Sequence, residues 1–463
     1  MTVDVADVVS PRDDGRVDKS SPRVCGGRLP KEVYARNFDD LHKPLTVQEA
    51  VIEADRCYFC HDAPCLEACP TGIDIPGFIR GIQTGNVEGA GRKILDANIL
   101  GGSCARVCPT EILCEGACVR HDQDGQPVKI GALQRHATDW LLDRSIQPFA
   151  RAPATGKRVA IVGAGPAGLA CAHHLSRLGH DVVIFEQRPK AGGLNEYGIA
   201  AYKVAHDFAQ REVAFLLSLG GIEIRHGAML GRDFELPELR QGHDAVFLSV
   251  GLGATNRLGL PNEELAGVED AVDYIAALRQ AADLAKLPVG EDVVVIGGGN
   301  TAIDIAIQAK RLGAANVTIV YRRGSAQMSA TAFEQELAQI NGCTLRHWAA
   351  PIALHGKDGR LTEVEFATTD LDPTGRLMLK GERFRLRADQ LFKAIGQTLD
   401  AGVFSSASAP RLDAKIGIDS AFATSLEGVF AGGDCVSRDQ DLTVVAVEDG
   451  KRAAAVIHTY LQP

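Results

Sequence analysis

The sequence has little of what marks a nucleic-acid-binding or an all-β protein. Lys and Arg number 49 against 59 Asp and Glu, so the formal net charge is -10. This balance argues against a broad basic surface that would grip phosphates, and no nucleic acid is expected as a partner. Aromatic residues make up only 5% of the chain while Gly numbers 49, which is typical of nucleotide-binding α/β proteins rather than of β-sandwiches or β-barrels.

Long apolar segments are missing as well. No uninterrupted apolar stretch reaches the roughly 18 residues of a membrane-spanning helix, so no membrane contact is expected. Residues 1–23 contain five Asp and no continuous apolar core, which excludes a secretory signal. We therefore expect a cytoplasmic protein, in which cysteines rarely pair as disulfides.

The length of 463 residues predicts two or three domains. A capping-box pattern from Thr46 to Glu49 opens a region of short helices, Cys-Pro pairs and Gly without strand-like alternation. We predict an α/β protein with two Rossmann-like domains preceded by an α-helical domain. The expected boundaries are 1–28 for a mobile acidic tail, 29–150 for the helical domain, 151–288 with 396–463 for a first dinucleotide-binding domain, and 289–395 for a second.

Two segments share the pattern strand, glycine-rich turn, helix, strand. Its elements lie at residues 158–162, 163–168, 169–178 and 181–186 in the first segment, and at 292–296, 297–302, 303–312 and 316–321 in the second. Such a unit is typical of a dinucleotide-binding fold. Two of them in one chain predict two dinucleotide-binding domains.

The first turn carries three glycines with separate roles. Gly163 suits a tight turn, Gly165 allows close approach of a pyrophosphate, and Gly168 allows the helix to pack on the strand. The helix that follows would direct its free amides at the phosphates. Glu186, 23 residues after Gly163, is placed to accept hydrogen bonds from a ribose. We predict that this unit binds FAD.

The second turn differs at two positions. Ala302 replaces the third glycine, and Tyr321 stands where the first unit has Glu186. Arg322 and Arg323 follow, and their guanidinium groups suit a 2'-phosphate that a carboxylate would repel. Alternatively, these arginines occupy a solvated strand end. The other candidates for contact with NADH or NADPH are Gly297, Gly299, Asn300 and Thr301.

A third strand and helix pattern lies near the C-terminus, at residues 428–435 and 443–460. One strand and one helix need an existing sheet, so we expect them to return to the first unit. Asp434 is a candidate for contact with a flavin, although it could instead cap a helix. The candidate flavin contacts outside the first turn are Gly193, Leu194, Gly433, Asp434 and Thr443.

Cysteine spacing is the most informative pattern. Cys57, Cys60, Cys65 and Cys69 have the spacing C-x2-C-x4-C-x3-C, and Cys104, Cys108, Cys114 and Cys118 have C-x3-C-x5-C-x3-C. Proline follows Cys69 and Cys108. In two-cluster ferredoxins the cysteine before proline ligates the other cluster. We therefore expect Cys69 to join the second group, and the first group to take one thiolate from the second run.

Structural zinc is the main alternative for these cysteines. Zinc would not need the exchange of ligands, and a neighbouring flavin site favours electron transfer. His61 lies inside the first run, and we expect it to be solvent-exposed. The scattered Cys25, Cys171, Cys343 and Cys435 are expected to be inert thiols, with flavin contact as an alternative for Cys435.

Three runs together resemble dihydropyrimidine dehydrogenase, and the resemblance covers about residues 30–460. They lie at residues 37–40, 57–70 and 107–118. The chain is also similar to small subunits of glutamate synthase and to bifurcating ferredoxin–NADP oxidoreductases. All are adrenodoxin-reductase-like flavoproteins with an N-terminal iron–sulfur domain. The five residues between Cys108 and Cys114 and the Ala-Pro between Cys60 and Cys65 favour the pyrimidine enzymes.

The resemblance implies two 4Fe–4S clusters and a ligand set for each. It implies Cys57, Cys60, Cys65 and Cys118 on one cluster and Cys69, Cys108, Cys114 and Gln134 on the other. Gln134 matches an unusual glutamine ligand of the pyrimidine enzyme, and Cys104 is then not a ligand. Lys203 departs from the arginine that the mammalian enzyme has near its flavin. No FMN-binding barrel follows residue 463, which is a second departure.

The function implied is that of an electron-input subunit. NADH, with NADPH as the alternative donor, would reduce FAD, and electrons would leave through the two clusters to a PreA-like catalytic subunit. That partner would carry FMN and iron–sulfur clusters, reduce uracil or thymine, and form a heterotetramer with this chain. The alternatives are delivery of electrons to an amidotransferase large subunit of glutamate synthase, and a zinc-containing redox sensor without enzymatic activity.

Overall fold

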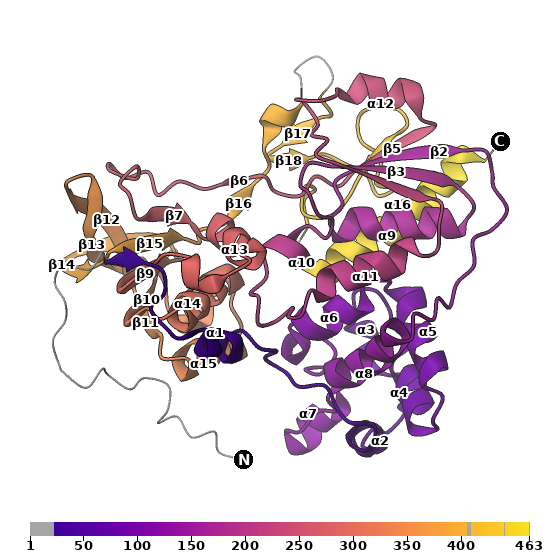
Figure 1. The fold of residues 1–463 in the computed structure, drawn as a ribbon, viewed down its shortest axis with the longest axis horizontal. Coiled ribbons are helices and arrows are strands. Elements are labelled where there is room, and N and C mark those ends of the chain that lie inside the picture. Colours follow the sequence, from indigo (N-terminus) through magenta and orange to yellow (C-terminus); the bar gives the residue numbers. More distant parts are fainter. Residues whose placement is uncertain (1–22, 405–408, 439, 463) are drawn as a thin grey trace.

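The computed structural model describes residues 23–404, 409–438 and 440–462. Figure 1 shows a helical domain beside two nucleotide-binding-type units, each built on a five-stranded parallel sheet. The predicted fold class is confirmed by this architecture. No helix in the described ranges is long and apolar enough to cross a membrane.

The helical domain begins at the predicted capping box. The Thr46 hydroxyl accepts from the backbone N of Glu49 at 3.2 Å, and the Glu49 carboxylate accepts from that of Thr46 at 2.8 Å. Phe78, Ile94 and Leu133 are buried in its core. The helices are α2 (Val47–Asp55), α3 (Pro64–Glu67), α4 (Ile75–Gln83), α5 (Val87–Ala97), α6 (Gly101–Val107), α7 (Val119–Asp124) and α8 (Ile130–Asp143).

The first nucleotide-binding-type unit has the strand order β19-β5-β2-β3-β4. Its strands are β2 (Arg158–Val162), β3 (Asp181–Glu186), β4 (Ile222–His226), β5 (Ala245–Leu248) and β19 (Val429–Ala431). Its helices are α9 (Pro166–Arg177), α10 (Leu194–Tyr197), α11 (Phe208–Leu217), α12 (Leu236–Gly242) and α16 (Thr443–Leu461). Because β19 pairs in parallel with β5, the predicted return of the C-terminal segment to this unit is confirmed.

The second unit has the strand order β11-β10-β9-β15-β7. Its strands are β7 (Val268–Asp270), β9 (Asp292–Ile296), β10 (Asn316–Tyr321), β11 (Thr344–His347) and β15 (Gln390–Lys393). Its helices are α13 (Ala271–Gln280), α14 (Asn300–Arg311) and α15 (Ala332–Ile340). An antiparallel sheet of β12 (Ala349–Lys357), β13 (Arg360–Leu371) and β14 (Leu377–Arg387) extends it. Strands β6 (Ala254–Thr255) and β16 (Gln397–Thr398) pair where the chain passes between the two units.

Two expected boundaries need correction. Strand β7 pairs with β15, so the second unit begins before residue 268 and not at 289. At the N-terminus, β1 (Val24–Cys25) pairs with β8 (Val289–Gly290), and the Arg23 guanidinium lies 2.6 Å from Asp292. Helix α1 (Lys31–Asn37) also packs on the second unit through the buried Tyr34. Residues 23–37 therefore belong to neither a mobile tail nor the helical domain, while residues 1–22 lie outside the described residues.

Candidate functional site

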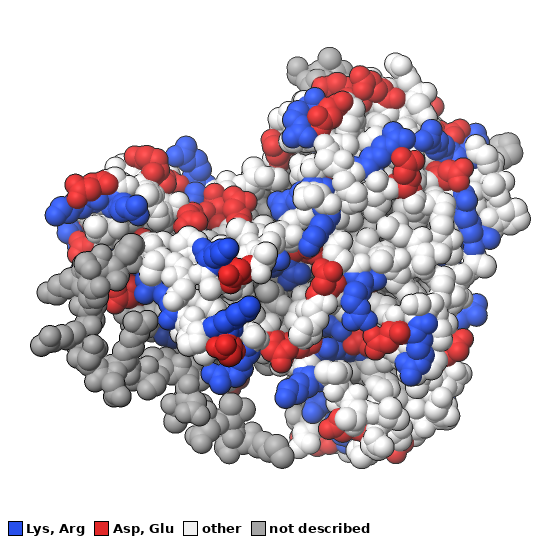
Figure 2. Space-filling model, viewed as in Figure 1, with Lys and Arg blue, Asp and Glu red and all other residues white. Residues whose placement is uncertain are grey.

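One large cavity lies where the three parts of the chain meet. It has a volume of about 1210 Å³ and is lined by residues of both nucleotide-binding-type units and of the helical domain. Figure 2 shows acidic and basic side chains intermingled on the face in view, which is notched between its two upper lobes. The predicted site residues in its lining are Gly163, Gly165, Glu186, Gly193, Leu194, Gly433, Asp434, Thr443, Asn300, Thr301 and Cys108.

The first glycine turn forms a tight cradle at the start of α9. Gly163 has φ of +99°, and a Cβ there would lie 2.4 Å from the carbonyl oxygen of Ser249. A Cβ on Gly168 would lie 2.0 Å from the carbonyl oxygen of Gly163. At Gly165 the nearest atom would be 3.8 Å away, so a side chain there would enter the cavity instead. No side chain caps α9, which leaves its first amides free for an anionic ligand.

Glu186 is held in a fixed orientation at the end of β3. It is 6% exposed, and its Oε2 accepts from the backbone N of Ala164 at 2.8 Å. Its Oε1 accepts from the backbone N of Arg188 at 2.8 Å. These two bonds hold the carboxylate beside the turn, where its remaining lone pairs can accept ribose hydroxyls.

Helix α16 brings a second N-terminus to the cavity. The backbone N of Gly433 donates to Asp449 at 2.9 Å, and the Thr443 hydroxyl donates to Asn195 at 3.1 Å. Burial raises the pKa of Asp434 to about 6, with nearby Asp441 adding to the effect. Cys435 is completely buried, its pKa is raised by burial to about 12, and it does not line the cavity.

The backbone of the second glycine turn follows the same path as that of the first, but a different side chain lies over it. A Cβ on Gly297 would lie 2.2 Å from the carbonyl oxygen of Ala394, and Ala302 is fully buried where the first unit requires glycine. The ring of Tyr321 lies over Gly298, since a Cβ there would be 2.5 Å from the ring. Asn300 and Thr301 reach the cavity at the start of α14.

Six of the residues predicted to bind FAD or the nicotinamide nucleotide do not line the cavity. They are Gly168, Gly297, Gly299, Ala302, Arg322 and Arg323. Arg322 is exposed and Arg323 partly so, and within the described ranges neither guanidinium takes part in a hydrogen bond or ion pair. Their side chains therefore remain available to a ligand at the end of β10.

A buried ion pair joins the two units beside the cavity. The Lys203 ammonium lies 2.7 Å from Asp304 of α14 and 2.6 Å from Glu334 of α15. Asp304 also accepts from the backbone N of Ala200 at 3.1 Å. Burial lowers the pKa of Lys203, but the two carboxylates outweigh it and the net shift is upward. Burial raises the pKa of Glu334 against the opposing charge of Lys203.

The first group of cysteines lies together in the helical domain. Cys57, Cys60, Cys65 and Cys118 line one small apolar pocket. Burial and then the neighbouring thiols raise the pKa of Cys65 to about 12. Phe59 has φ of +51°, and its backbone N donates to the Cys57 sulfur at 3.4 Å. An N–H bond of this kind stabilises a thiolate ligand.

The second group contains Cys69, Cys108 and Cys114. The pKa of Cys108 is raised first by the adjacent Cys104 thiol and then by burial and by Cys114 and Cys69. Burial is the largest cause that raises the pKa of Cys114, and Cys69 adds to it. Cys118 thus lies beside the cysteines of the first run, and Cys69 lies near Cys108 and Cys114 of the second.

Cys104 lies beside Cys108 of the second group, and Gln134 lies on α8 against the start of α6. Gln134 is 7% exposed, and its Nε2 donates to the carbonyl oxygen of Gly101 at 2.7 Å. Its Oε1 accepts no bond from any described residue. Among the described residues no three His, Cys, Asp or Glu side chains converge closely enough to hold a single metal ion.

These residues fit the cofactors that the sequence implies. Thiols with raised pKa values need a strong cation to become thiolates, and two grouped thiol sets provide donors for iron–sulfur centres. The free amides of α9, the open position at Gly165 and the oriented Glu186 fit the pyrophosphate and ribose of a dinucleotide.

Sequence reasoning missed several residues at this junction. Arg106, Arg135 and Glu334 line the cavity, yet none belongs to a recognisable motif. Their partners are far apart in the sequence, as in the bonds from Arg135 to Asp40 and from Lys203 to Glu334. No local spacing could have indicated them.

Comparison with known proteins shows the family to which the chain belongs. A family model described as dihydropyrimidine dehydrogenase domain II, 4Fe-4S cluster, matches residues 34–146, and one described as pyridine nucleotide-disulphide oxidoreductase matches residues 157–450. The dihydropyrimidine dehydrogenase subunit PreT of Salmonella typhimurium is 35% identical over 94% of this chain and 99% of its own. The glutamate synthase [NADPH] small chain of Escherichia coli is 33% identical over 95% and 97%.

Among solved structures, FprA of Mycobacterium tuberculosis matches with a TM-score of 0.55, 20% identity, and coverage of 67% of this chain and 85% of that one. This likeness supports the two-unit fold. The family models show a flavin- and iron–sulfur-containing oxidoreductase that uses NAD(P)H. The chain therefore belongs to the family of iron–sulfur flavoprotein oxidoreductases that includes the PreT subunit of dihydropyrimidine dehydrogenase and the small chain of glutamate synthase.

Proposed function

We propose that this chain is the electron-input subunit of an NAD-dependent dihydropyrimidine dehydrogenase. One observation carries the proposal: a single cavity reaches the first glycine turn, the start of α14 and Cys108 of the helical domain. The cofactors would be FAD, two 4Fe–4S clusters and NADH, with NADPH as a second donor. Bound there, the flavin would take a hydride from the nicotinamide and pass its electrons singly to the clusters.

The residues of the first unit would hold FAD. The α9 amides at Gly165 would face the pyrophosphate, and Glu186 would accept the ribose hydroxyls. Asp434, in the turn after β19, and Thr443, at the start of α16, would contact the flavin. The start of α14, at Asn300 and Thr301, would bind the nicotinamide nucleotide, and the Lys203 ion pair would keep the two units in register.

The cysteine groups define an order for electron transfer. Cys108 lines the cavity, so the cluster of Cys69, Cys108, Cys114 and Gln134 would receive electrons first. The cluster of Cys57, Cys60, Cys65 and Cys118 would pass them on. Tyr58 beside this group is 50% exposed, and His61 is exposed as the sequence predicts. This face is where we place the partner subunit.

The Gln134 assignment is tested by substitution. Gln134→Cys should keep both clusters and lower the reduction potential of one, since a thiolate adds a negative charge that the amide lacks. Gln134→Ala with full iron content, unaltered reduction spectra and unaltered electron transfer would contradict the assignment and favour Cys104 as fourth ligand.

The function is tested with the purified chain and a candidate partner. Alone, the chain should reduce an artificial electron acceptor with NADH and leave uracil untouched. Addition of an FMN-containing PreA-like subunit should produce dihydrouracil and a heterotetramer. Turnover of uracil by the chain alone would contradict the proposal.

Delivery of electrons to a glutamate synthase large subunit is the second candidate, because the glutamate synthase small chain is 33% identical over 95% of this chain. A complex with that subunit that makes glutamate from glutamine and 2-oxoglutarate would favour it. A zinc-containing sensor would be colourless, whereas the proposed protein should be yellow-brown and bleach with NADH.

A further inference from the structure

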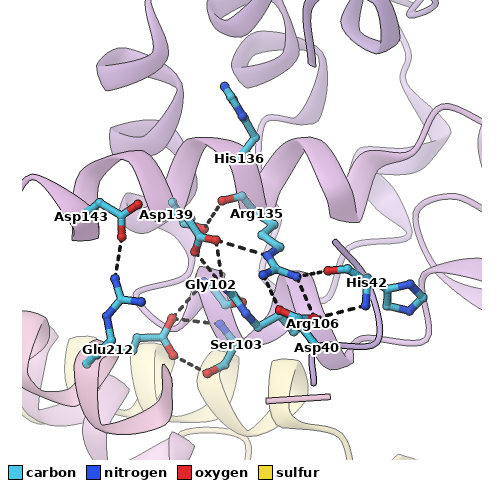
Figure 3. A network of polar contacts seen from close by, with 12 residues as sticks. Asp40, His42, Gly102, Ser103, Arg106, Arg135, His136, Asp139, Asp143 and Glu212 are labelled. Atoms are coloured by element: carbon cyan, nitrogen blue, oxygen red, sulfur yellow. Dashed lines mark hydrogen bonds and ion pairs between the residues drawn. The ribbon is translucent and has the colours of Figure 1, made fainter. Parts of the chain in front are cut away.

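The helical domain meets the first nucleotide-binding unit along α11, which contacts α6 and α8. Figure 3 shows the polar side chains that converge there, with Glu212 of α11 facing the start of α6. Glu212 is 2% exposed. Its Oε1 accepts from the backbone N of Gly102 at 2.9 Å and of Ser103 at 3.0 Å, and its Oε2 accepts from the Ser103 hydroxyl. One carboxylate of the first unit thus satisfies the free amides of a helix in another domain.

The same contact leaves α6 no room to shift. A Cβ on Gly102 would lie 2.6 Å from the Phe208 ring and 2.9 Å from Glu212. The guanidinium of Arg106 lies 3.4 Å from the centre of the Phe208 ring. Arg106 also donates to both carboxylate oxygens of Asp139 on α8, at 2.9 and 2.8 Å. Helix α6 is therefore fixed against α11 and against α8.

Helix α6 carries the nearest proposed cluster ligand to the cavity. Its last residue precedes Cys108, and residues 105–110 line the cavity. On its other side, Gln134 donates to the carbonyl oxygen of Gly101 at 2.7 Å. The position of Cys108 relative to the first glycine turn therefore follows the position of α6.

We propose that Glu212 is a positioning residue that holds α6, and with it Cys108, at the separation from the flavin site that fast electron transfer requires. The inference rests on the proposed function, because it assumes that electrons pass from the flavin to the second cysteine group. Positioning sets the rate of such a step, because misplacement of the donor and acceptor slows it. Burial raises the pKa of Glu212 to about 7, and the bonds from Ser103 and the charge of Arg106 oppose that rise. The donors of α6 and Arg106 thus offset part of the effect of burial on this carboxylate.

The test separates the two steps of one turnover. The holoprotein is mixed anaerobically with NADH, and flavin reduction and cluster reduction are followed as separate spectral phases. Glu212→Ala should slow cluster reduction by about tenfold or more. Flavin reduction should stay within about twofold of the unaltered protein, because Glu212 does not line the cavity. Glu212→Gln keeps an accepting oxygen and should recover part of the rate.

Two further variants complete the experiment. Ser103→Ala removes one donor to Glu212 and should slow cluster reduction to a smaller extent. If Glu212→Ala loses iron, this variant tests the positioning role in its place. Glu223→Gln is the control, because Glu223 is exposed on β4 and pairs with Arg225. A Glu212→Ala protein that keeps its iron and reduces its clusters at the unaltered rate would overturn the positioning role. Clusters that stay oxidised in the unaltered protein would overturn the proposed electron path, and this inference with it.

Discussion

In the first nucleotide-binding unit the carboxylate of Glu186 lies on the backbone N of Ala164, whereas in the second unit the ring of Tyr321 lies over Gly298 at the same place in the turn. The two strands that present these side chains end at matching points of their sheets. The same fold thus places a different type of side chain over the glycine turn in each unit. A carboxylate suits ribose hydroxyls, while an aromatic ring next to arginines leaves room for a phosphate.

The helix behind each turn shows the same contrast. Gly168 lies so close to its turn that a Cβ would be 2.0 Å from the carbonyl oxygen of Gly163. Ala302 occupies the matching position in α14 and is fully buried without such a clash. The first turn is therefore packed more tightly on its helix than the second, and the first unit should tolerate change less.

Exchange of these two residues should produce the largest difference between the units. Gly168→Ala should destabilise the protein by more than about 3 kcal/mol, because the new methyl group meets backbone that cannot move aside. It should also abolish flavin binding. Ala302→Gly should cost about 1–2 kcal/mol for the lost methyl group and the added helix entropy, with flavin retained. Thermal unfolding and the flavin content per chain measure the effects of the two substitutions. Equal losses of stability and of flavin in the two variants would contradict the tighter packing of the first turn.

The second largest effect should come from the ion pair that joins the units. Lys203→Met leaves Asp304 and Glu334 facing each other without a cation and should cost about 3–5 kcal/mol at neutral pH. Burial already raises the pKa of Glu334, and loss of Lys203 should raise it further. A carboxyl group whose folded-state pKa is raised contributes stability at low pH that is lost as the pH rises through that pKa.

The stability deficit of Lys203→Met should therefore be greatest at neutral and alkaline pH and narrow as the pH falls. Denaturant unfolding of the variant and the unaltered protein at a series of pH values measures it. Lys157→Met is the control, since Lys157 pairs with Asp244 at the surface. A deficit that does not change with pH would show that the lost lysine acted through packing rather than charge.

Much of this arrangement follows from local pattern. The strands at 158–162, 181–186, 292–296 and 316–321 lie where the sequence predicts, because a buried strand followed by glycines is a short-range signal. The helix after each turn is also present, but it begins three residues earlier than predicted, at Pro166 and at Asn300. The position of Cys69 near Cys108 and Cys114 also agrees with a local pattern, since proline follows Cys69. Strand β7 and the contacts of Lys203 and Glu212 could not, because their partners lie at least 100 residues away.

A smaller effect should follow from loss of the Glu186 carboxylate. Glu186→Gln places an NH2 group against the backbone N–H of Ala164 or Arg188, both of which now donate to the carboxylate. The dissociation constant of FAD should rise about tenfold, some 1.4 kcal/mol. The matching change in the second unit, Tyr321→Phe, removes only the bond to the carbonyl oxygen of Gln327. It should leave FAD binding unaltered, and an equal loss in both variants would contradict the assignment of Glu186 to FAD.

An effect of similar size, confined to one donor, should distinguish the two nicotinamide donors. We expect kcat/KM to be higher for NADH than for NADPH in the unaltered protein, and an NADPH preference above about tenfold would contradict this. The double variant Arg322→Ala and Arg323→Ala should lower kcat/KM for NADPH by about tenfold, some 1.4 kcal/mol, because the lost guanidinium groups would have paired with the 2'-phosphate. The value for NADH should stay within about twofold, and stability within about 0.5 kcal/mol, since both side chains lack ion pairs among the described residues.

Arg376→Ala, in the exposed turn between β13 and β14, is the control for loss of a surface charge. Equal losses for both donors would instead indicate that the arginines act on a part of the nucleotide that NADH and NADPH share.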